Sequence, residues 1–271
     1  MKSFHIVKPG SEVHLDEHDP AATGNFGDGD DAPKAARKRL EGLQEELHEL
    51  QGLLYADNRH ALLIVLQGTD ASGKDGTIRH VLSGLSPIGV HVTGFKVPND
   101  EERDHDYLWR IHQAMPRRGE IGIFNRSHYE DVLVPRVHGL VPKSVWEARY
   151  RQINDLERSL AENGTVILKF FLHISKDEQK RRFEERLSDP HKYWKFALGD
   201  IEERKLWDEY KRAYEVLLTK CSTKWAPWTI VPADRKWYRN LVVAETTVRA
   251  LKDLDMRYPP PSFDRSKVVI E

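Results

Sequence analysis

The stretch that decides the fold is 61–75, ALLIVLQGTDASGKD. Its first six residues, 61–66, are all apolar, which predicts a buried strand that runs directly into a glycine-rich turn. Gly68, Gly73 and Lys74 have the spacing of a phosphate-binding loop, which follows a buried strand and opens a helix. The backbone N–H groups of such a loop and the positive end of the helix dipole hold an anion, and the lysine adds a point charge for phosphate oxygens. We therefore expect an α/β fold with a phosphate site at this turn.

Two carboxylates belong to this loop. Asp75 stands where Ser or Thr would ordinarily supply a hydroxyl to Mg²⁺, and Asp70 lies inside the turn. Carboxylates so close to phosphate would repel it unless a metal ion lies between them or they point away. Because Mg²⁺ prefers a few carboxylates together with phosphate oxygens, the loop is predicted to bind metal-complexed phosphate. For Asp75 a second interpretation stays open, in which its charge simply favours the first turn of the helix.

The length and composition favour a single globular domain. The chain has 271 residues, a length that suits one α/β domain with insertions or a small appendage. Its formal net charge of −1 argues against a dedicated nucleic-acid-binding protein, which usually carries a basic excess. A single cysteine, Cys221, cannot form an intrachain disulfide and fits a reducing compartment. The longest apolar runs are too short to span a membrane, and residues 1–10 lack the apolar core of a secretory signal. We expect a cytoplasmic protein that binds neither nucleic acid nor membrane.

Strands alternate with helices downstream of the loop. Strands are expected at 90–95, 122–124, 165–172 and 228–231, and helices at 100–115, 143–162, 176–187, 200–220 and 235–255. Such alternation predicts a parallel sheet with right-handed crossovers. Ligands of these sheets bind outside the carboxyl ends of the strands, so the loop and the segment after the 122–124 strand should share one crevice.

The N-terminal part differs in composition from the rest. Residues 16–33 are acidic and rich in Gly, Ala and Pro, which predicts an irregular or mobile arm over 1–33. A helix over 34–56 follows, with a leucine stripe at Leu40, Leu43, Leu47, Leu50 and Leu54. The stripe either packs on the main domain or makes a subunit contact. Residues 34–271 are expected to form a single domain that contains the phosphate-binding loop.

The segment after the 122–124 strand carries a second charged constellation. Arg126 can form a planar fork onto phosphate, and phosphoryl transfer needs such a cation. Asn125 stands where many phosphate-loop enzymes carry a metal-binding Asp, so Glu130 and Asp131 are the natural substitutes. In the competing interpretation, these acids pair structurally with Arg126 or Arg136.

A third basic segment has the pattern of a lid. Arg182 and Arg186 are four residues apart and share a helix face, and Lys192 and Lys195 follow after a proline break. A hinged basic flap can screen phosphates and exclude water. Nearby acidic residues leave a plainer interpretation open, a solvated helix with ordinary ion pairs.

With these residues in view, the chain resembles the polyphosphate kinase 2 family over about residues 35–270. The resemblance rests on GTDASGKDG (68–76), FNRSHYEDVLV (124–134), RRFEERLSDPHKYWKF (181–196) and APW with VPADRKWYRN (226–228 and 231–240). It implies a P-loop kinase-like, three-layer αβα sandwich with a parallel sheet and a helical lid at about 176–206.

The resemblance also implies a role for each matching residue. The catalytic residues would be Asp70, Lys74 and Arg126. Polyphosphate would be bound by Gly68, Ala71, Ser72, Gly73, Lys74, Asp75, Arg126, Arg182 and Arg186. The nucleotide would be bound by Asn125, Glu130, Asp131 and Arg136, and Mg²⁺, with Mn²⁺ as a substitute, by Asp70 and Glu130. Asn125 with Glu130 resembles the subgroup, class III, that phosphorylates both AMP and ADP.

The implied reaction is the reversible, Mg²⁺-dependent transfer of the terminal phosphoryl group of inorganic polyphosphate to AMP and ADP, forming ADP and ATP. The resemblance also implies a homo-oligomer, a dimer or a tetramer, with the 34–56 helix as a candidate contact. Two other functions stay open: an ATP-dependent nucleoside monophosphate kinase, and a non-catalytic nucleotide or polyphosphate sensor. The Asp70 and Asp75 pair favours the family over the monophosphate kinase, which normally has Ser or Thr after its lysine.

Overall fold

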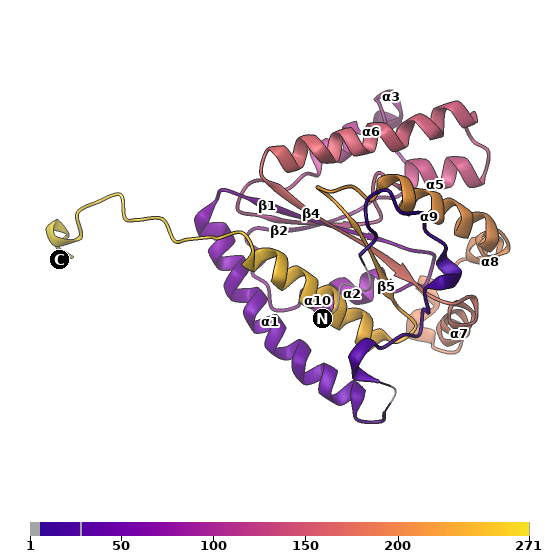
Figure 1. Ribbon diagram of the computed structural model, residues 1–271, viewed down its shortest axis with the longest axis horizontal. Coiled ribbons are helices and arrows are strands. Elements are labelled where there is room, and N and C mark those ends of the chain that lie inside the picture. The colour runs from indigo at the N-terminus through magenta and orange to yellow at the C-terminus, as the bar shows by residue number, and fades with distance from the viewer. Residues whose placement is uncertain (1–5, 28, 271) are drawn as a thin grey trace.

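The computed structural model describes residues 6–27 and 29–270, and its centre is a parallel sheet (Figure 1). The five strands lie in the order β2-β3-β1-β4-β5. Their bounds are β1 Ala61–Gln67, β2 Val90–Gly94, β3 Ile121–Asn125, β4 Thr165–His173 and β5 Trp228–Pro232. Each strand expected from the sequence is confirmed to within one residue at either end.

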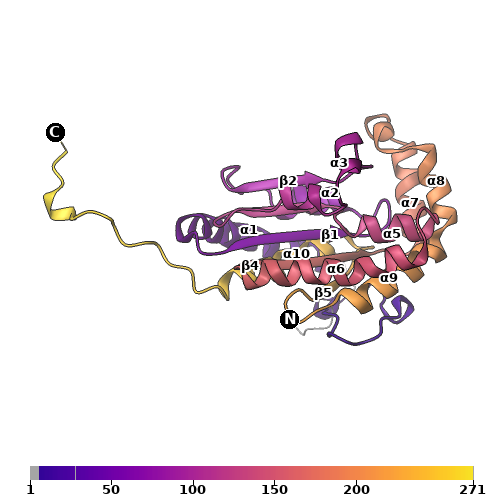
Figure 2. The ribbon, with the colours of Figure 1, turned by 90° about the horizontal axis from the view of Figure 1, so that it is seen from above.

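Helices cover both faces of the sheet. Their bounds are α1 Ala32–Asp57, α2 Lys74–Val81, α3 Asp100–Asp104, α4 Trp109–Gln113, α5 Glu130–Val137, α6 Lys143–Glu162, α7 Lys176–Leu187, α8 Leu198–Lys205, α9 Trp207–Cys221 and α10 Lys236–Lys252. Helices α1, α2 and α10 lie on one face and α5, α6 and α9 on the other (Figures 1 and 2). The predicted three-layer αβα sandwich is therefore confirmed. No helix in the described ranges is long and apolar enough to cross a membrane.

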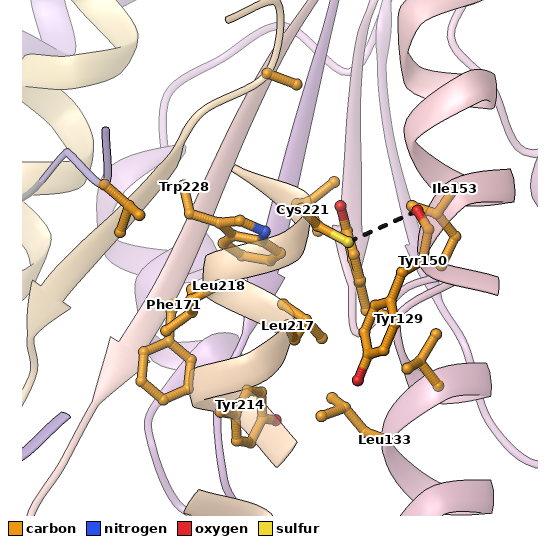
Figure 3. Packing of buried hydrophobic residues seen from close by; sticks show 14 of the residues in the cluster. Tyr129, Leu133, Tyr150, Ile153, Phe171, Tyr214, Leu217, Leu218, Cys221 and Trp228 are labelled. Atoms are coloured by element: carbon orange, nitrogen blue, oxygen red, sulfur yellow. Dashed lines mark hydrogen bonds between the residues drawn. The ribbon is translucent and has the colours of Figure 1, made fainter. Parts of the chain in front are cut away.

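Strand β1 is buried on both faces, which explains its unbroken apolar sequence. Leu62, Ile64 and Leu66 point into the core under α1 and α10, and Leu63 and Val65 into the core under α5, α6 and α9. Figure 3 shows part of the second core, where Trp228 of β5 and Leu217 of α9 pack near Tyr129. A central strand fixed on both sides holds the turn at its carboxyl end in one place.

The leucine stripe of α1 packs on the domain. Leu43, Leu47 and Leu54 are buried in the core that α1 shares with α10. The interpretation in which this helix covers the main domain is thus confirmed for the stripe. Any subunit contact would have to use the outer, polar face of α1.

Two expected helices are each broken in two. The expected 100–115 helix is α3 and α4, separated by an extended His105 (φ −106°, ψ 172°) and by a turn in which Asp106 accepts a hydrogen bond from the Leu108 N–H. Aspartate competes with the helix by bonding its own neighbouring backbone, which explains this break. The expected 200–220 helix is α8 and α9, interrupted at Leu206 (φ −90°, ψ 21°).

The N-terminal arm is irregular, with two short 3-10 turns, η1 Leu15–Glu17 and η2 Gly24–Phe26. It lies against the domain along α9 and β5. The Val7 N–H donates to the Trp228 carbonyl (2.8 Å), and the Val13 N–H to the Thr219 hydroxyl (3.0 Å). At the other end, the segment after α10 extends away from the domain and includes the turn η4 Arg265–Lys267 (Figures 1 and 2).

Candidate functional site

The turn after β1 has the conformation of a phosphate-binding loop. Gly68 (φ +152°) and Gly73 (φ +103°) have backbone angles that other residues rarely adopt. A Cβ on Gly68 would lie 2.7 Å from the Leu172 carbonyl oxygen, and one on Gly73 would collide with the Arg239 guanidinium. Helix α2 begins at Lys74, so its N-terminal N–H groups open onto the turn. Both glycines singled out in the sequence are therefore required by the geometry.

Lys74 lies folded over this loop. Its ammonium donates hydrogen bonds to the carbonyl oxygens of Gly68 (2.7 Å) and Thr69 (3.2 Å), and its side chain is buried. Burial, together with the neighbouring charge of Arg126, lowers the pKa of Lys74 to about 8. Negatively charged phosphate oxygens in the loop would favour the protonated form of Lys74, which burial disfavours.

Arg126 joins the loop to the end of β3. Its backbone has a positive φ of 64°, which turns the chain out of the strand at this residue. Its guanidinium donates to a carboxylate oxygen of Asp70 across 2.7 Å and lies 3.8 Å from a carboxylate oxygen of Glu130. The structure therefore brings the three predicted catalytic residues Asp70, Lys74 and Arg126 together.

Asp70 and Glu130 fit a divalent cation. Both carboxylates converge on Arg126, and burial raises the pKa of Glu130 above its ordinary value. A bound cation would favour the ionised form of Glu130, which burial disfavours. Carboxylate oxygens are also the ligands that Mg²⁺ prefers. No group of three or more His, Cys, Asp or Glu residues in the described ranges could hold a metal alone. Substrate oxygens would therefore have to complete the coordination.

Asn125 and Asp75 form a pair beside the loop. The Asn125 amide donates to a carboxylate oxygen of Asp75 across 2.6 Å, and Asp75 lies in the first turn of α2. Its negative charge there is favourable to the helix dipole, as the second interpretation of Asp75 expects. The contact adds a further role for Asp75, because it links the end of β3 to the start of α2.

Asp131 and Arg136 are held away from this site. The Asp131 carboxylate accepts a hydrogen bond from Arg110 (3.2 Å), and the Arg136 guanidinium donates to the Tyr150 hydroxyl (3.0 Å). Neither lines the groove described below. Their contact with the nucleotide stays a prediction, and in this structure the two side chains contact Arg110 of α4 and Tyr150 of α6. The structural pairing left open for Asp131 is present, but its partner is Arg110.

A long groove runs from the loop beneath the lid. It has a volume of about 1260 Å³ and is lined by the loop, by the start of α2, by the lid and by α1 and α10. Among its described lining residues are eleven Lys or Arg and five Asp or Glu. The lid segment contributes Arg186, Lys192 and Lys195, and the Arg186 guanidinium donates to the Lys195 carbonyl (2.9 Å). The lid cations predicted from the sequence therefore line a strongly basic channel.

Arg182 is an exception among the predicted lid cations. All five of its N–H donors are used, by the Glu178 carboxylate and by the carbonyl oxygens of Ala71, Ser72, Ala233 and Asp234. The side chain is 6% exposed. In this arrangement Arg182 supports the phosphate loop and also lines the groove, and its contact with polyphosphate stays a prediction.

Sequence reasoning missed Arg239 of α10. Its guanidinium lies against Gly73 and Ser72 of the loop, is 2% exposed, and bonds to the Asn240 side-chain oxygen (2.8 Å). No carboxylate in the described ranges pairs with it, and burial together with the charge of Arg182 lowers the pKa of Arg239 to about 9. The motif VPADRKWYRN contains this arginine, but nothing in the letters distinguishes a buried arginine from an exposed one.

A buried polar cluster supports the segment that carries Arg126. Lys169 donates to Glu157 (2.6 Å) and to the Tyr129 hydroxyl (2.8 Å), and all three side chains are fully buried. Burial alone would raise the pKa of Glu157, but the Lys169 ammonium holds it below its ordinary value. His128 also faces Glu157 (3.3 Å). Because His128 and Tyr129 directly follow Arg126 and Ser127, the cluster anchors this turn to β4 and α6.

Comparison with known proteins gives the same picture over almost the whole chain. Residues 31–259 match the family described as Polyphosphate kinase 2 (PPK2). The AMP/ADP-polyphosphate phosphotransferase of Meiothermus ruber is 52% identical over 271 residues, all of both chains. The ADP-polyphosphate phosphotransferase of Rhodopseudomonas palustris is 48% identical over 239 residues, 84% of this chain and 83% of the relative.

A solved structure is also closely similar. The polyphosphate kinase 2 of Arthrobacter aurescens superposes with a TM-score of 0.90 at 42% sequence identity, covering 98% of this chain and 97% of that one. Fold, phosphate loop and sequence agree, and the chain belongs to the polyphosphate kinase 2 family.

Proposed function

We propose that the protein transfers the terminal phosphoryl group of inorganic polyphosphate to AMP and to ADP, giving ADP and ATP reversibly. One observation carries this proposal: the groove with its excess of cations leads to the loop where Lys74 and Arg126 lie. A chain of phosphates needs a continuous line of positive charge, whereas a lone nucleotide needs much less. The relative from Meiothermus ruber is named for the same donor and the same two acceptors.

In this reaction the side chains position and neutralise the substrates. Lys74 and Arg126 face the phosphoryl group that moves, whose charge is spread over its oxygens in the transition state. An oxygen of the acceptor's terminal phosphate forms a bond to the terminal phosphorus of the donor. The bond from that phosphorus to the bridging oxygen breaks, and its electron pair stays on the shortened polyphosphate. No covalent intermediate with the enzyme is needed.

Asp70 has two roles in this account. It orients the Arg126 guanidinium through the 2.7 Å hydrogen bond, and with Glu130 it would hold Mg²⁺, or Mn²⁺ as a substitute. When bound, the ion would neutralise negative charge on the phosphate oxygens of the donor and the acceptor.

Use of both AMP and ADP is supported by Asn125 and Glu130, the two residues that resemble the class III subgroup. Asn125 ends β3 and bonds to Asp75 of the loop, and Glu130 begins α5 five residues later, 3.8 Å from the Arg126 guanidinium. We keep two further predictions as part of the proposal: a homo-oligomer, dimer or tetramer, and a cytoplasmic location. Light scattering after size exclusion tests the first.

An end-point assay tests the proposal against its alternatives. Purified protein is incubated with Mg²⁺, long-chain polyphosphate and either AMP or ADP, and the nucleotides are separated by chromatography. The proposal expects ADP and ATP from AMP, and ATP from ADP. Transfer from ATP to AMP with inert polyphosphate would identify a monophosphate kinase, and tight binding without turnover a sensor.

A further inference from the structure

The first two turns of α7 bond to the backbone of the phosphate loop. The Gln179 amide donates a hydrogen bond to the Asp70 carbonyl oxygen (3.0 Å). The Arg182 guanidinium donates to the carbonyl oxygens of Ala71 (2.8 Å) and Ser72 (3.0 Å). Both donating side chains are buried. Three consecutive carbonyl groups of the loop are therefore bonded to one helix.

These bonds decide which way the peptide units of the loop face. In a trans peptide the C=O and the N–H point in opposite directions. Because the Asp70 and Ser72 carbonyls point toward α7, the N–H groups of Ala71 and Gly73 point away from it, and both residues line the groove. Converging N–H groups are what an anion site in such a loop requires. Ala71 also has a φ of +62°, which is costly for a residue with a Cβ, so the loop needs contacts that hold this shape.

The N-terminus of α7 is capped by a residue from another part of the chain. Ser175 is the N-cap, and its hydroxyl accepts a hydrogen bond from the Glu178 N–H (3.0 Å). In a capping box, the carboxylate of Glu178 would in turn accept from the N-cap N–H. Here it accepts from Arg181 (2.6 Å) and Arg182 (2.7 Å) instead. The Ser175 N–H donates to the Asp234 carboxylate (2.8 Å). Asp234 therefore completes the cap, and Glu178 can orient Arg182.

The turn that carries Asp234 is itself fixed on several sides. The Asp234 N–H donates to the Pro20 carbonyl of the N-terminal arm (3.0 Å), and the Asp234 carbonyl accepts from Arg182 (3.1 Å). The Ala233 carbonyl also accepts from Arg182 (2.6 Å), and the Ala233 N–H donates to the His173 carbonyl at the end of β4 (2.8 Å). The turn after β5 thus joins the arm, the sheet and α7, which lies beside the end of that strand (Figure 1).

We propose that Asp234 is a positioning residue for phosphate binding. By capping α7 it keeps Gln179 and Arg182 on the loop carbonyls, and so keeps the loop N–H groups aimed at the substrate. Asp234 does not line the groove, so it acts through α7. The inference rests on the proposed function only for the identity of the substrate, polyphosphate. It also gives the N-terminal arm a role, because the Pro20 carbonyl helps to hold Asp234 in place.

Matched variants test this role by tripolyphosphate binding, measured by titration calorimetry. Asp234→Ala removes the acceptor of the Ser175 N–H, whereas Asp234→Asn keeps an oxygen in the same place. Thr219→Val is the control, because it removes a different contact of the N-terminal arm, the bond from the Val13 N–H. We expect Asp234→Ala to weaken binding by about tenfold, on the scale of one lost helix cap. Asp234→Asn and Thr219→Val should stay within about twofold of the wild type.

Hydrogen–deuterium exchange of the ligand-free proteins gives a second readout. Asp234→Ala should speed exchange in peptides covering 68–77 and 175–182 and leave 61–67 as in the wild type, because only the cap and the loop are loosened. Faster exchange spread evenly over the sheet would make Asp234 a structural residue only and overturn the inference. Unchanged exchange at 68–77 with unchanged tripolyphosphate affinity, in a folded Asp234→Ala, would overturn it as well.

A further variant covers the case in which Asp234→Ala does not fold. Gln179→Met keeps the cap and removes only the bond to the Asp70 carbonyl. It should produce both changes on a smaller scale, with binding weakened by about threefold and faster exchange at 68–77. Wild-type behaviour of Gln179→Met in both measurements would contradict the inference.

Turnover separates this inference from the proposed function. With polyphosphate and ADP, Asp234→Ala should raise the KM for polyphosphate more than it lowers kcat, and Asp234→Asn should restore the KM. Binding and exchange need no turnover, so the two proposals can fail separately. Inert polyphosphate, together with the expected losses in Asp234→Ala, refutes the proposed function and supports the inference. Turnover with polyphosphate that is unchanged in a folded Asp234→Ala does the reverse.

Discussion

Arg126 donates a hydrogen bond to Asp70 across 2.7 Å, which ties the residue after β3 to the middle of the phosphate loop. A flexible arginine at the end of a strand is thereby held next to Lys74 before any substrate arrives. Preorganised cations at the place where charge develops are a main source of rate enhancement. We therefore expect the rate of phosphoryl transfer to depend on the Arg126 guanidinium.

Replacement of Arg126 by alanine should lower turnover by roughly 10³-fold or more, because one transition-state cation is lost. Lys74→Ala should have an effect of similar size. Steady-state kinetics with polyphosphate and ADP measure both, and Arg151→Ala, an exposed arginine on α6, is the control. Near wild-type turnover in either variant would remove that residue from the site.

The affinity for polyphosphate should fall as pH rises through about 8, the pKa to which burial lowers Lys74. Only the protonated ammonium attracts phosphate, so binding of tripolyphosphate should weaken by about tenfold between pH 7 and pH 9. Lys74→Arg, which stays charged, should flatten this profile. Titration calorimetry in matched buffers provides the measurement, and identical profiles for both proteins would contradict the assignment.

The stability of the ligand-free protein has the opposite dependence on pH. Because the folded pKa of Lys74 lies below its unfolded value of 10.5, the unfolded state binds more protons between about pH 8 and 10.5. This residue's contribution to the free energy of unfolding should therefore rise with pH in that window. Urea unfolding of wild type and Lys74→Met at pH 7.5 and 9.5 isolates the effect, and a gap between the two proteins that does not change with pH would refute it.

Arg239 should contribute to substrate binding more than to folding. It is a buried cation without a carboxylate partner in the described ranges, placed against Gly73 and Ser72. We expect Arg239→Met to raise the KM for polyphosphate by about tenfold or more, because the loop loses a fixed positive charge. Its melting temperature without ligand should not fall, since an uncompensated buried charge is removed. A lower melting temperature with an unchanged KM would make Arg239 a structural residue only.

The Lys169 and Glu157 pair should be essential for stability. Both side chains are fully buried, so Glu157→Gln leaves an ammonium without its counter-charge and should cost about 3–5 kcal/mol of unfolding free energy. The double variant Glu157→Leu with Lys169→Met should recover part of this loss. Urea unfolding measures these losses. A loss in the double variant equal to the sum of the losses in its two single variants would show that the two residues do not act as a pair.

The sequence predicts well what depends on local pattern. The apolar run of β1 and the Gly and Lys spacing after it place the loop correctly, because strand and turn are specified within fifteen residues. Lys74, Asp70 and Arg126 can be predicted as site residues because each follows a strand whose carboxyl end the sheet must bring to one edge.

Contacts between residues far apart in the chain could not be predicted from the sequence. Arg110 is 21 residues from its partner Asp131, and the carbonyl oxygens that saturate Arg182 come from two separate turns. Burial of Arg239 follows only from the packing of α10 on the loop. The breaks at His105 and Leu206 also escaped prediction, since local hydrogen bonding and backbone geometry overrode helical periodicity there.

The most direct measurement follows both substrates at once by ³¹P nuclear magnetic resonance. Protein, Mg²⁺, polyphosphate and AMP are mixed without ATP. The account predicts that β-phosphate signals of ADP, and then γ-phosphate signals of ATP, appear one for one with the loss of polyphosphate phosphoryl groups. New phosphate appearing only as free orthophosphate, or no nucleotide product until ATP is added, would contradict it.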